Sequence, residues 1–123
     1  MKPLAALLIL ICASVLGRAE SFVVDRHCDS VAEVLQRKIP ELSLDRLFEA
    51  KRGSAEWHYA FWTRIEKTWV EEVRIFVRQK SAASSEVEVG VFKIEGGFVK
   101  TTTKPQPLGS SEWTAKIRAA IAK

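Results

Sequence analysis

Residues 56–79 decide the fold, and their sequence is EWHYAFWTRIEKTWVEEVRIFVRQ. Apolar and polar side chains alternate along much of this stretch, and a period of two is typical of β-strands. The pattern predicts two strands, at about 56–64 and 68–79. In the first strand, one face carries Trp57, Tyr59 and Phe61, and the other carries His58, Ala60 and Trp62. In the second, one face carries Trp69, Val73, Ile75 and Val77, and the other carries Val70, Arg74, Phe76 and Arg78.

Two further strands are expected after this pair, at about 86–95 and 98–103. Gly96-Gly97 between them is a two-residue hairpin signal, because both glycines can take a positive φ. That turn would place Phe92 opposite Thr101. It would also put Phe92, Ile94 and Val99 on the core side, while Val87, Val89 and Val91 have the opposite parity. A β-bulge near Gly90 would turn both sets inward; the alternative is that both faces of this strand are partly covered.

Helices are expected on either side of the strands. Ser30 and Glu33 have capping-box spacing, and an apolar stripe follows them until Pro40, where the helix should stop. A shorter helix is expected from Ser43 to about Gly53, with its apolar face made of Leu44, Leu47 and Phe48. Residues 20–28 form a brief edge strand or a docked arm, and residues 104–107 an extended connector. A last helix begins at Ser110 or Ser111, and its apolar stripe consists of Trp113, Ile117, Ala120 and Ile121.

The predicted fold class is therefore α+β. A four-stranded antiparallel meander packs against N-terminal helices and a C-terminal helix, in two layers. This order of elements loosely resembles cystatin-like folds, in which a helix packs across a curved antiparallel sheet. The resemblance concerns the architecture alone and implies no activity.

The first nineteen residues have the pattern of a secretory signal peptide. Lys2 gives a basic start, residues 4–16 carry no charge, and small residues Gly17 and Ala19 precede the expected cleavage site. The apolar run is shorter than the roughly 17–25 residues of a membrane span. Cys12 lies inside the run without a small residue before it, which argues against a lipoprotein. We expect cleavage after Ala19, or after Gly17, and export of residues 20–123 as one domain to the periplasm or the medium, with no membrane span.

Charge argues against a nucleic-acid partner. The full chain has 19 Lys and Arg against 15 Asp and Glu, and removing Lys2 and Arg18 with the signal leaves 17 against 15, a formal +2. That charge is not the strongly basic footprint of nucleic-acid binding. Positive residues do gather from position 99 onward, around the C-terminal helix. One alternative reading is therefore an anion-binding module that uses this helix.

Catalytic and metal-binding groups are few after the signal. A thiol enzyme would need Cys28 beside a base, and His58 is the candidate. That pair is the alternative enzymatic reading. His27, Cys28 and Asp29 could hold an adventitious ion, but a dedicated zinc site needs more ligands than this chain offers. We expect no metal site and no cofactor.

Aromatic residues are the most informative candidates for function, because they gather on both faces of the first two strands. If helices cover one face, a small ligand, a protein partner or a second copy of the chain would cover the other. The leading hypothesis is a non-enzymatic module that binds through this sheet face. Its candidate residues are Trp62, Arg74, Phe76 and Arg78.

Overall fold

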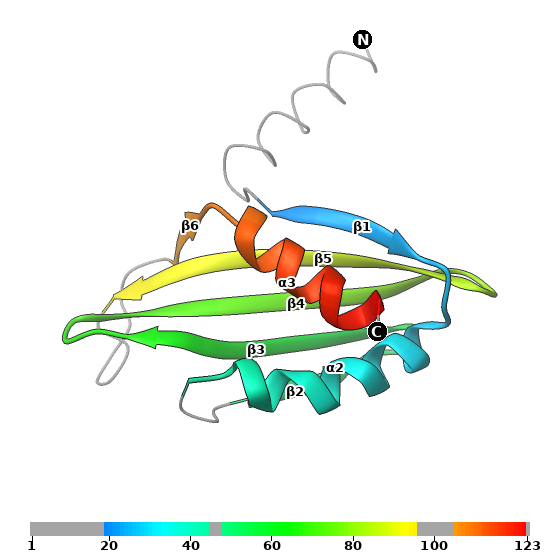
Figure 1. The fold of residues 1–123 in the computed structure, drawn as a ribbon, viewed down its shortest axis with the longest axis horizontal. Coiled ribbons are helices and arrows are strands. Elements are labelled where there is room, and N and C mark those ends of the chain that lie inside the picture. The colour runs from blue at the N-terminus through cyan, green and yellow to red at the C-terminus, as the bar shows by residue number, and fades with distance from the viewer. Residues whose placement is uncertain (1–18, 45–47, 96–104, 123) are drawn as a thin grey trace, which may run out of the picture.

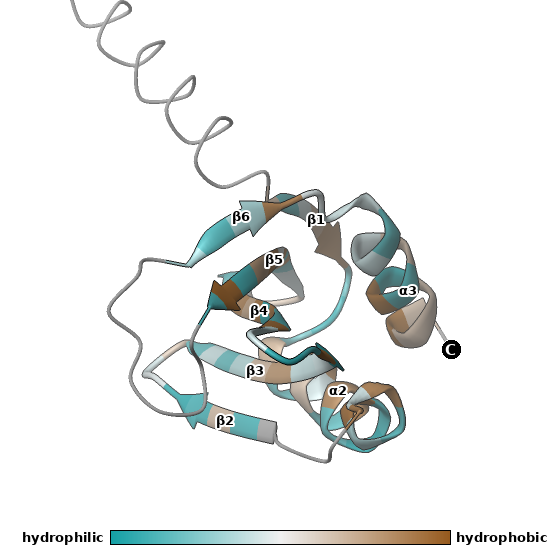
Figure 2. Ribbon diagram, turned by 90° about the vertical axis from the view of Figure 1, so that its left-hand side faces the viewer, coloured by the Kyte–Doolittle hydropathy of each residue, from teal (hydrophilic) through white to brown (hydrophobic). Residues whose placement is uncertain are grey.

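Two helices lie on the same side of an antiparallel sheet, and no helix among the described residues covers the other side (Figures 1 and 2). The computed structural model describes residues 19–44, 48–95 and 105–122, and all that follows concerns these residues. The fold is α+β, as the alternation and the helical stripes predict. Within the described ranges, no helix has the length and apolar character needed to cross a membrane.

Six strands and two helices make up the described chain. Their order is β1 (Glu20–Val24), α2 (Cys28–Leu42), β2 (Phe48–Arg52), β3 (Glu56–Ile65), β4 (Trp69–Ser81), β5 (Ser84–Glu95), β6 (Gln106–Leu108) and α3 (Ser111–Ala122). The strands lie side by side in the order β1-β5-β4-β3-β2, and β6 also pairs with β5. The predicted strands at 56–64, 68–79 and 86–95 are thus confirmed as β3, β4 and β5, and the brief edge strand near residue 20 is confirmed as β1.

The core lies between the sheet and the two helices. Tyr59 of β3, Ile75 of β4 and Val89 of β5 stand in one row across the sheet, and all three are buried. Leu35 and Ile39 of α2 are also buried in this core, together with Ile117 and Ile121 of α3. The helices therefore bury the apolar stripes that the sequence predicts, against one face of the sheet.

The second helix expected from Ser43 is a wrong prediction. Residues 48–52 form strand β2, which pairs with β3 so that Ala50 lies opposite Tyr59. The Gly53 N–H donates to the Glu56 carbonyl over 2.9 Å and closes the turn between the two strands. Leu44, expected on the buried stripe, is 60% exposed. A helix of only five residues would be marginally stable, whereas pairing with the edge of β3 satisfies the backbone N–H and C=O groups of this segment.

The limits of the first helix also differ from the prediction. It begins at Cys28, and its N-cap is His27, whose Nδ1 accepts from the Asp29 N–H at 3.1 Å; Ser30 is already helical. The helix runs through Pro40 to Leu42, and the Ser43 N–H donates to the Ile39 carbonyl over 2.8 Å. Proline removes one helical hydrogen bond. Burial of Ile39 and packing of Leu42 against the core offset that loss.

The core face of β5 is the reverse of the expected one. Val87, Val89 and Val91 face the helices, while Phe92 and Ile94 lie half-buried on the opposite side. The register runs without a shift past Gly90, which lies opposite Arg74, so there is no β-bulge at this position. A Cβ atom on Gly90 would lie 3.0 Å from a ring atom of Phe92. A larger residue would therefore have to push that ring aside by a few tenths of an ångström. Both faces of the strand are partly covered.

The predicted hairpin after β5 is contradicted where it can be checked. Pro107 of β6 takes the position opposite Phe92, so the expected pairing of Phe92 with Thr101 is wrong. Gly96-Gly97 and the strand expected at 98–103 lie outside the described residues. The expected connector ends in β6, at the sheet edge where a proline is tolerated. The last helix is confirmed from Ser111. The finer prediction of a four-stranded meander with three helices therefore holds only in part.

Candidate binding site on the uncovered sheet face

The face of the sheet opposite the helices is called the open face here. On β4 it carries Arg74, Phe76 and Arg78, because the alternating Val73, Ile75 and Val77 are buried in the core. Trp62 of β3 is on the same face, since it lies opposite Glu72 in the register. All four candidate binding residues of the sequence analysis are thus on one side, with side chains of intermediate exposure.

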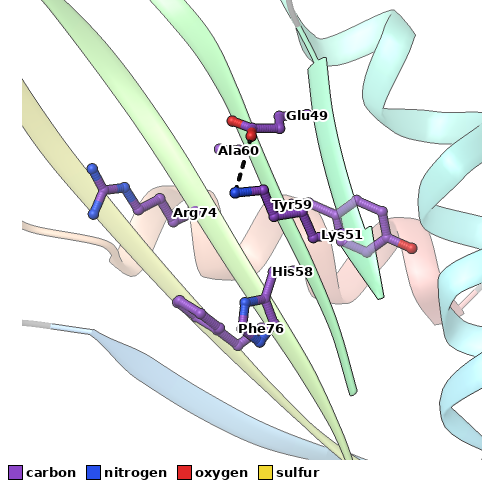
Figure 3. A pocket seen from close by; sticks show the side chains of 7 residues that line it. All are labelled: Glu49, Lys51, His58, Tyr59, Ala60, Arg74 and Phe76. Atoms are coloured by element: carbon purple, nitrogen blue, oxygen red, sulfur yellow. Dashed lines mark ion pairs between the residues drawn. The ribbon is translucent and has the colours of Figure 1, made fainter. Parts of the chain in front are cut away.

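A hollow of about 140 Å³ lies on the open face where β2, β3 and β4 run side by side (Figure 3). Its lining side chains come from alternate positions of these three strands: Glu49 and Lys51 of β2, His58 and Ala60 of β3, and Arg74 and Phe76 of β4. Tyr59 borders it as well, but its ring points to the other side of the sheet, where the hydroxyl lies 3.4 Å from the Ala32 carbonyl of α2.

Two rings form one wall of the hollow. His58 packs edge-on against Phe76, with the ring centroids 4.5 Å apart. His58 Nε2 is shielded from solvent and makes no hydrogen bond in the described structure, although Glu56 Oε2 lies 3.3 Å away. The geometry of that ion pair is therefore not that of a hydrogen bond. This wall offers an apolar and aromatic surface with one polar nitrogen that lacks a hydrogen-bond partner.

The cations beside the hollow are neutralised by neighbouring carboxylates. Lys51 Nζ lies 3.3 Å from Glu49 Oε1, and Arg74 Nε donates to Glu72 Oε2 over 2.6 Å. The Arg74 guanidinium also lies over the Phe92 ring, 4.6 Å from its centroid. Because each positive charge has a carboxylate partner, the hollow has little net charge of its own. Shape and ring stacking, rather than charge, should decide what fits there.

The two remaining candidates, Trp62 and Arg78, are not among the described residues that line the hollow. The Trp62 Nε1–H donates to Glu72 Oε1 over 3.1 Å. Arg78 Nη1 lies 3.0 Å from Glu88 Oε1, and its guanidinium covers Phe76 at 5.4 Å from the ring centroid. Arg78 therefore closes one end of the aromatic wall. Arg74 and Phe76 therefore both line the hollow, whereas Trp62 and Arg78 lie on the same face outside its lining.

Glu49, Lys51 and Ala60 line the hollow, but the sequence does not single them out as binding residues. The pattern predicts a helix over Glu49 and Lys51, which would not pair with β3 as strand β2 does. The signal that would have found them is the short alternation in residues 48–52, which is too brief to separate a strand from a helix by periodicity.

The structure does not bring Cys28 and His58 together. Cys28 is 3% exposed in the core between α2 and the sheet, whereas His58 lies on the open face. Burial, and next the Asp29 carboxylate, raise the pKa of the Cys28 thiol above its ordinary value. A nucleophilic cysteine needs a lowered pKa and a base within reach. The geometry therefore offers no support for a thiol enzyme built on this pair.

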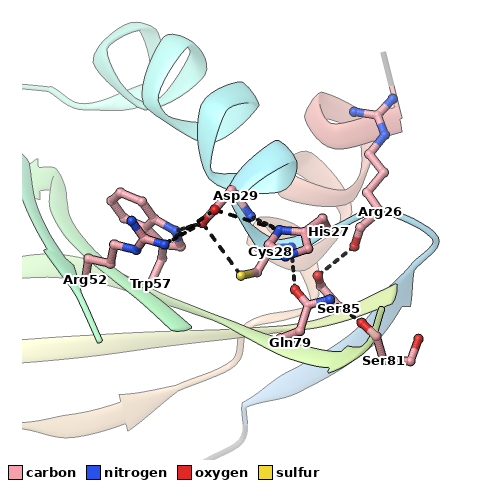
Figure 4. Close-up of polar contacts among 9 residues, drawn as sticks. All are labelled: Arg26, His27, Cys28, Asp29, Arg52, Trp57, Gln79, Ser81 and Ser85. Carbon is pink, nitrogen blue, oxygen red and sulfur yellow. Dashed lines mark hydrogen bonds and ion pairs between the residues drawn. The ribbon is translucent and has the colours of Figure 1, made fainter. Parts of the chain in front are cut away.

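A polar cluster at the start of α2 ties this helix to the sheet (Figure 4). Trp57 Nε1–H donates to Asp29 Oδ1 over 3.0 Å, and an Arg52 Nη2–H donates to Asp29 Oδ2 over 3.4 Å. The Trp57 hydrogen bond and, next among the favourable contacts, the Arg52 charge lower the pKa of Asp29, although burial opposes them. The Cys28 N–H donates to Gln79 Oε1 over 2.8 Å. These contacts fix the first turn of the helix on β3 and β4.

The adventitious metal site considered from the sequence involves the same residues. His27, Cys28 and Asp29 each place one ligand atom within 4.8 Å of the others. The Cys28 thiol is buried with a raised pKa, and Asp29 already accepts from Trp57 and Arg52. Because metal binding needs a thiolate and a free carboxylate, an ion here would have to displace these contacts.

Comparisons with known proteins leave the site to be judged by its own geometry. No protein-family model matches the chain, and searches of curated proteins and of solved structures gave no significant match.

Proposed function

We propose that the chain is an exported, non-enzymatic binding domain that holds its ligand or partner on the open face of the sheet. One observation carries this proposal: the hollow between Lys51, His58, Arg74 and Phe76 lies on the face that no described helix covers. Half-buried aromatic rings that do not belong to the core are typical of binding surfaces.

The size of the hollow indicates how a partner would use it. Pockets that enclose a whole small ligand commonly measure about 300–1,000 Å³, and this hollow has about 140 Å³. It therefore fits one ring or one side chain of a larger partner. A planar group would stack beside Phe76 and His58, and an acceptor atom on it would find the N–H groups of Lys51 and Arg74 at the rim. A second copy of the chain is one such partner, and the oligomeric state in solution tests that case.

The proposal also includes export of the chain and a cystatin-like layout of its helices and sheet. The signal pattern of residues 1–19 supports delivery to the periplasm or the medium. The long helix α2 across an antiparallel sheet supports a cystatin-like layout, from which the chain departs by its second helix α3 on the same face.

The experiment that tests the binding face is an NMR titration of the full chain with single-ring fragments. The set should hold aromatic carboxylates, aromatic amides and saturated rings of equal size. We expect the largest shifts in the backbone amides of residues 49–51, 58–60 and 74–76, and stronger binding of planar than of saturated rings. Shifts confined to α2 or α3, or no preference for planar rings, would refute the proposal.

A further inference from the structure

A second candidate site lies on the helix side of the sheet, where two arginines have no carboxylate partner among the described residues. Arg52, Arg64, Arg74 and Arg78 each lie within 4.0 Å of a carboxylate oxygen. Arg26, Arg37 and Arg118 make no such ion pair with a carboxylate in the described ranges. Arg26 and Arg118 border the same groove, although β1 and α3 lie at opposite ends of the sequence.

The groove has about 310 Å³ and runs between the end of β1 and the last turns of α3. Its floor consists of Phe22 and Ile121, which are 6% and 2% exposed and belong to the main core. Val23, at 55% the most exposed apolar residue of β1, forms one wall together with Val24. An alkyl chain lying in the groove would extend the core and leave water, which is favourable in proportion to the apolar area that it buries.

The mouth of the groove carries three charges. Arg118 lies over the Phe22 ring, with its Cζ 4.8 Å from the centroid, and Arg26 lines the groove from the turn after β1. The Arg26 carbonyl accepts from Ser85 Oγ over 2.7 Å, so its backbone is fixed to β5. Asp25 also borders the groove and opposes the two arginines.

We propose that this groove binds an aliphatic carboxylate. The two guanidinium groups recognise the carboxylate through charge-assisted hydrogen bonds, and the alkyl chain covers Phe22 and Ile121. The carbonyl groups at the end of α3 carry partial negative charge. They keep the carboxylate away from Ala122 and thereby fix the orientation of the ligand. This site is independent of the open face, and it gives the basic C-terminal helix a specific ligand chemistry.

The test compares three eight-carbon probes by calorimetry on the full chain: octanoate, the neutral octanol and the cationic octylamine. We expect octanoate to bind at least tenfold more tightly than octylamine. Arg26→Gln and Arg118→Gln should each weaken octanoate binding about three- to tenfold, and Asp25→Asn should strengthen it about two- to fivefold; none of these effects exceeds the roughly 1.4 kcal/mol that makes a factor of ten. Octanol binding should change less than twofold in all three variants.

Arg37→Gln is the matched control, because Arg37 is an exposed arginine of α2 that makes no ion pair with a described carboxylate and does not line the groove. Thermal unfolding of each variant shows whether it is folded. Equal affinity for octanoate and octanol would overturn the proposal. It would also be overturned if Arg37→Gln weakened octanoate binding as much as the two groove variants, or if Asp25→Asn weakened it.

Discussion

The ring of His58 meets the ring of Phe76 edge-on, 4.5 Å between centroids, on the side of the sheet away from the buried Cys28. These two rings lie on the open face, and the chemical character of that face differs from that of the helix side. The helix side holds the apolar core, whereas the open face carries half-buried rings among ion pairs. The hollow beside His58 and Phe76 is where that open face can accept a group from outside.

The two faces should differ in their contribution to stability. Phe61 is 1% exposed in the core and packs edge-on against Trp113 at 5.8 Å, so Phe61→Ala should lower the free energy of unfolding by about 3–5 kcal/mol. Phe76 is only half-buried, and Phe76→Ala should cost about 1–2 kcal/mol on the same principle. Urea unfolding curves give both values. Equal losses would mean that the open face is part of the core.

Stability should fall in alkaline solution. Burial raises the pKa of the Cys28 thiol above its ordinary 9.0 and that of Tyr59 above 10.0, so folding favours the protonated forms. Their contribution is complete below the ordinary pKa and is lost as the pH rises through the folded pKa. We expect the free energy of unfolding to decrease above about pH 9. Cys28→Ala should remove the earlier part of that decrease. The same alkaline profile in this variant would contradict the assignment.

In acid, the group to follow is Asp29. The hydrogen bond from Trp57 and the charge of Arg52 lower its pKa from the ordinary 3.8. The stability it contributes is therefore present above 3.8 and is lost as the pH falls through the folded pKa. Trp57→Phe should raise the pKa of Asp29 in an NMR titration of its side-chain carboxyl carbon. Trp62→Phe, which removes an indole bonded to Glu72 instead, is the control. An unchanged midpoint in Trp57→Phe would contradict the hydrogen bond.

Export can be tested on the N-terminus of the product. If residues 1–19 are a signal peptide, the exported chain should begin at Glu20, or at Arg18 for the alternative cut after Gly17. Intact-mass measurement of material from outside the cytoplasm distinguishes these cases. Ala19→Arg should block the first cut, because the peptidase needs a small residue there. Exported material that still begins at Met1 would refute the signal.

Long alternating segments were predictable, and short or interrupted ones were not. Strands β3 and β4 follow from the alternation around Tyr59 and Ile75, since ten or more residues fix both the period and the buried face. Residues 48–52 were misassigned because a five-residue strand is stabilised by its neighbour β3, which local sequence does not reveal. The end of helix α2 was also not predictable from local sequence. Proline usually ends a helix, but the packing of Leu42 against the core stabilises the helix beyond Pro40.

The candidate site was predictable in its face but not in its composition. Parity along each strand puts Trp62 on the face opposite Tyr59, and puts Arg74, Phe76 and Arg78 on one face; the pairing of Trp62 with Glu72 joins these two sets on the open face. The hollow itself needs Glu49 and Lys51, which are brought to Arg74 only by the pairing of β2 with β3. Gly90 was a second misleading signal. It lies beside the Phe92 ring on the same strand, where an added Cβ would come within 3.0 Å of that ring, and the register does not shift there.

The most direct test of the open face as the binding surface is to fill the hollow. Ala60 lines it, so Ala60→Phe would place a ring where the partner group is expected, and Ala119→Phe makes the same change on the exposed side of α3. The measurement is the dissociation constant of the best planar fragment, by calorimetry, for the chain and both variants. We predict at least tenfold weaker binding to Ala60→Phe and unchanged binding to Ala119→Phe. Unchanged affinity in a folded Ala60→Phe protein would contradict the account.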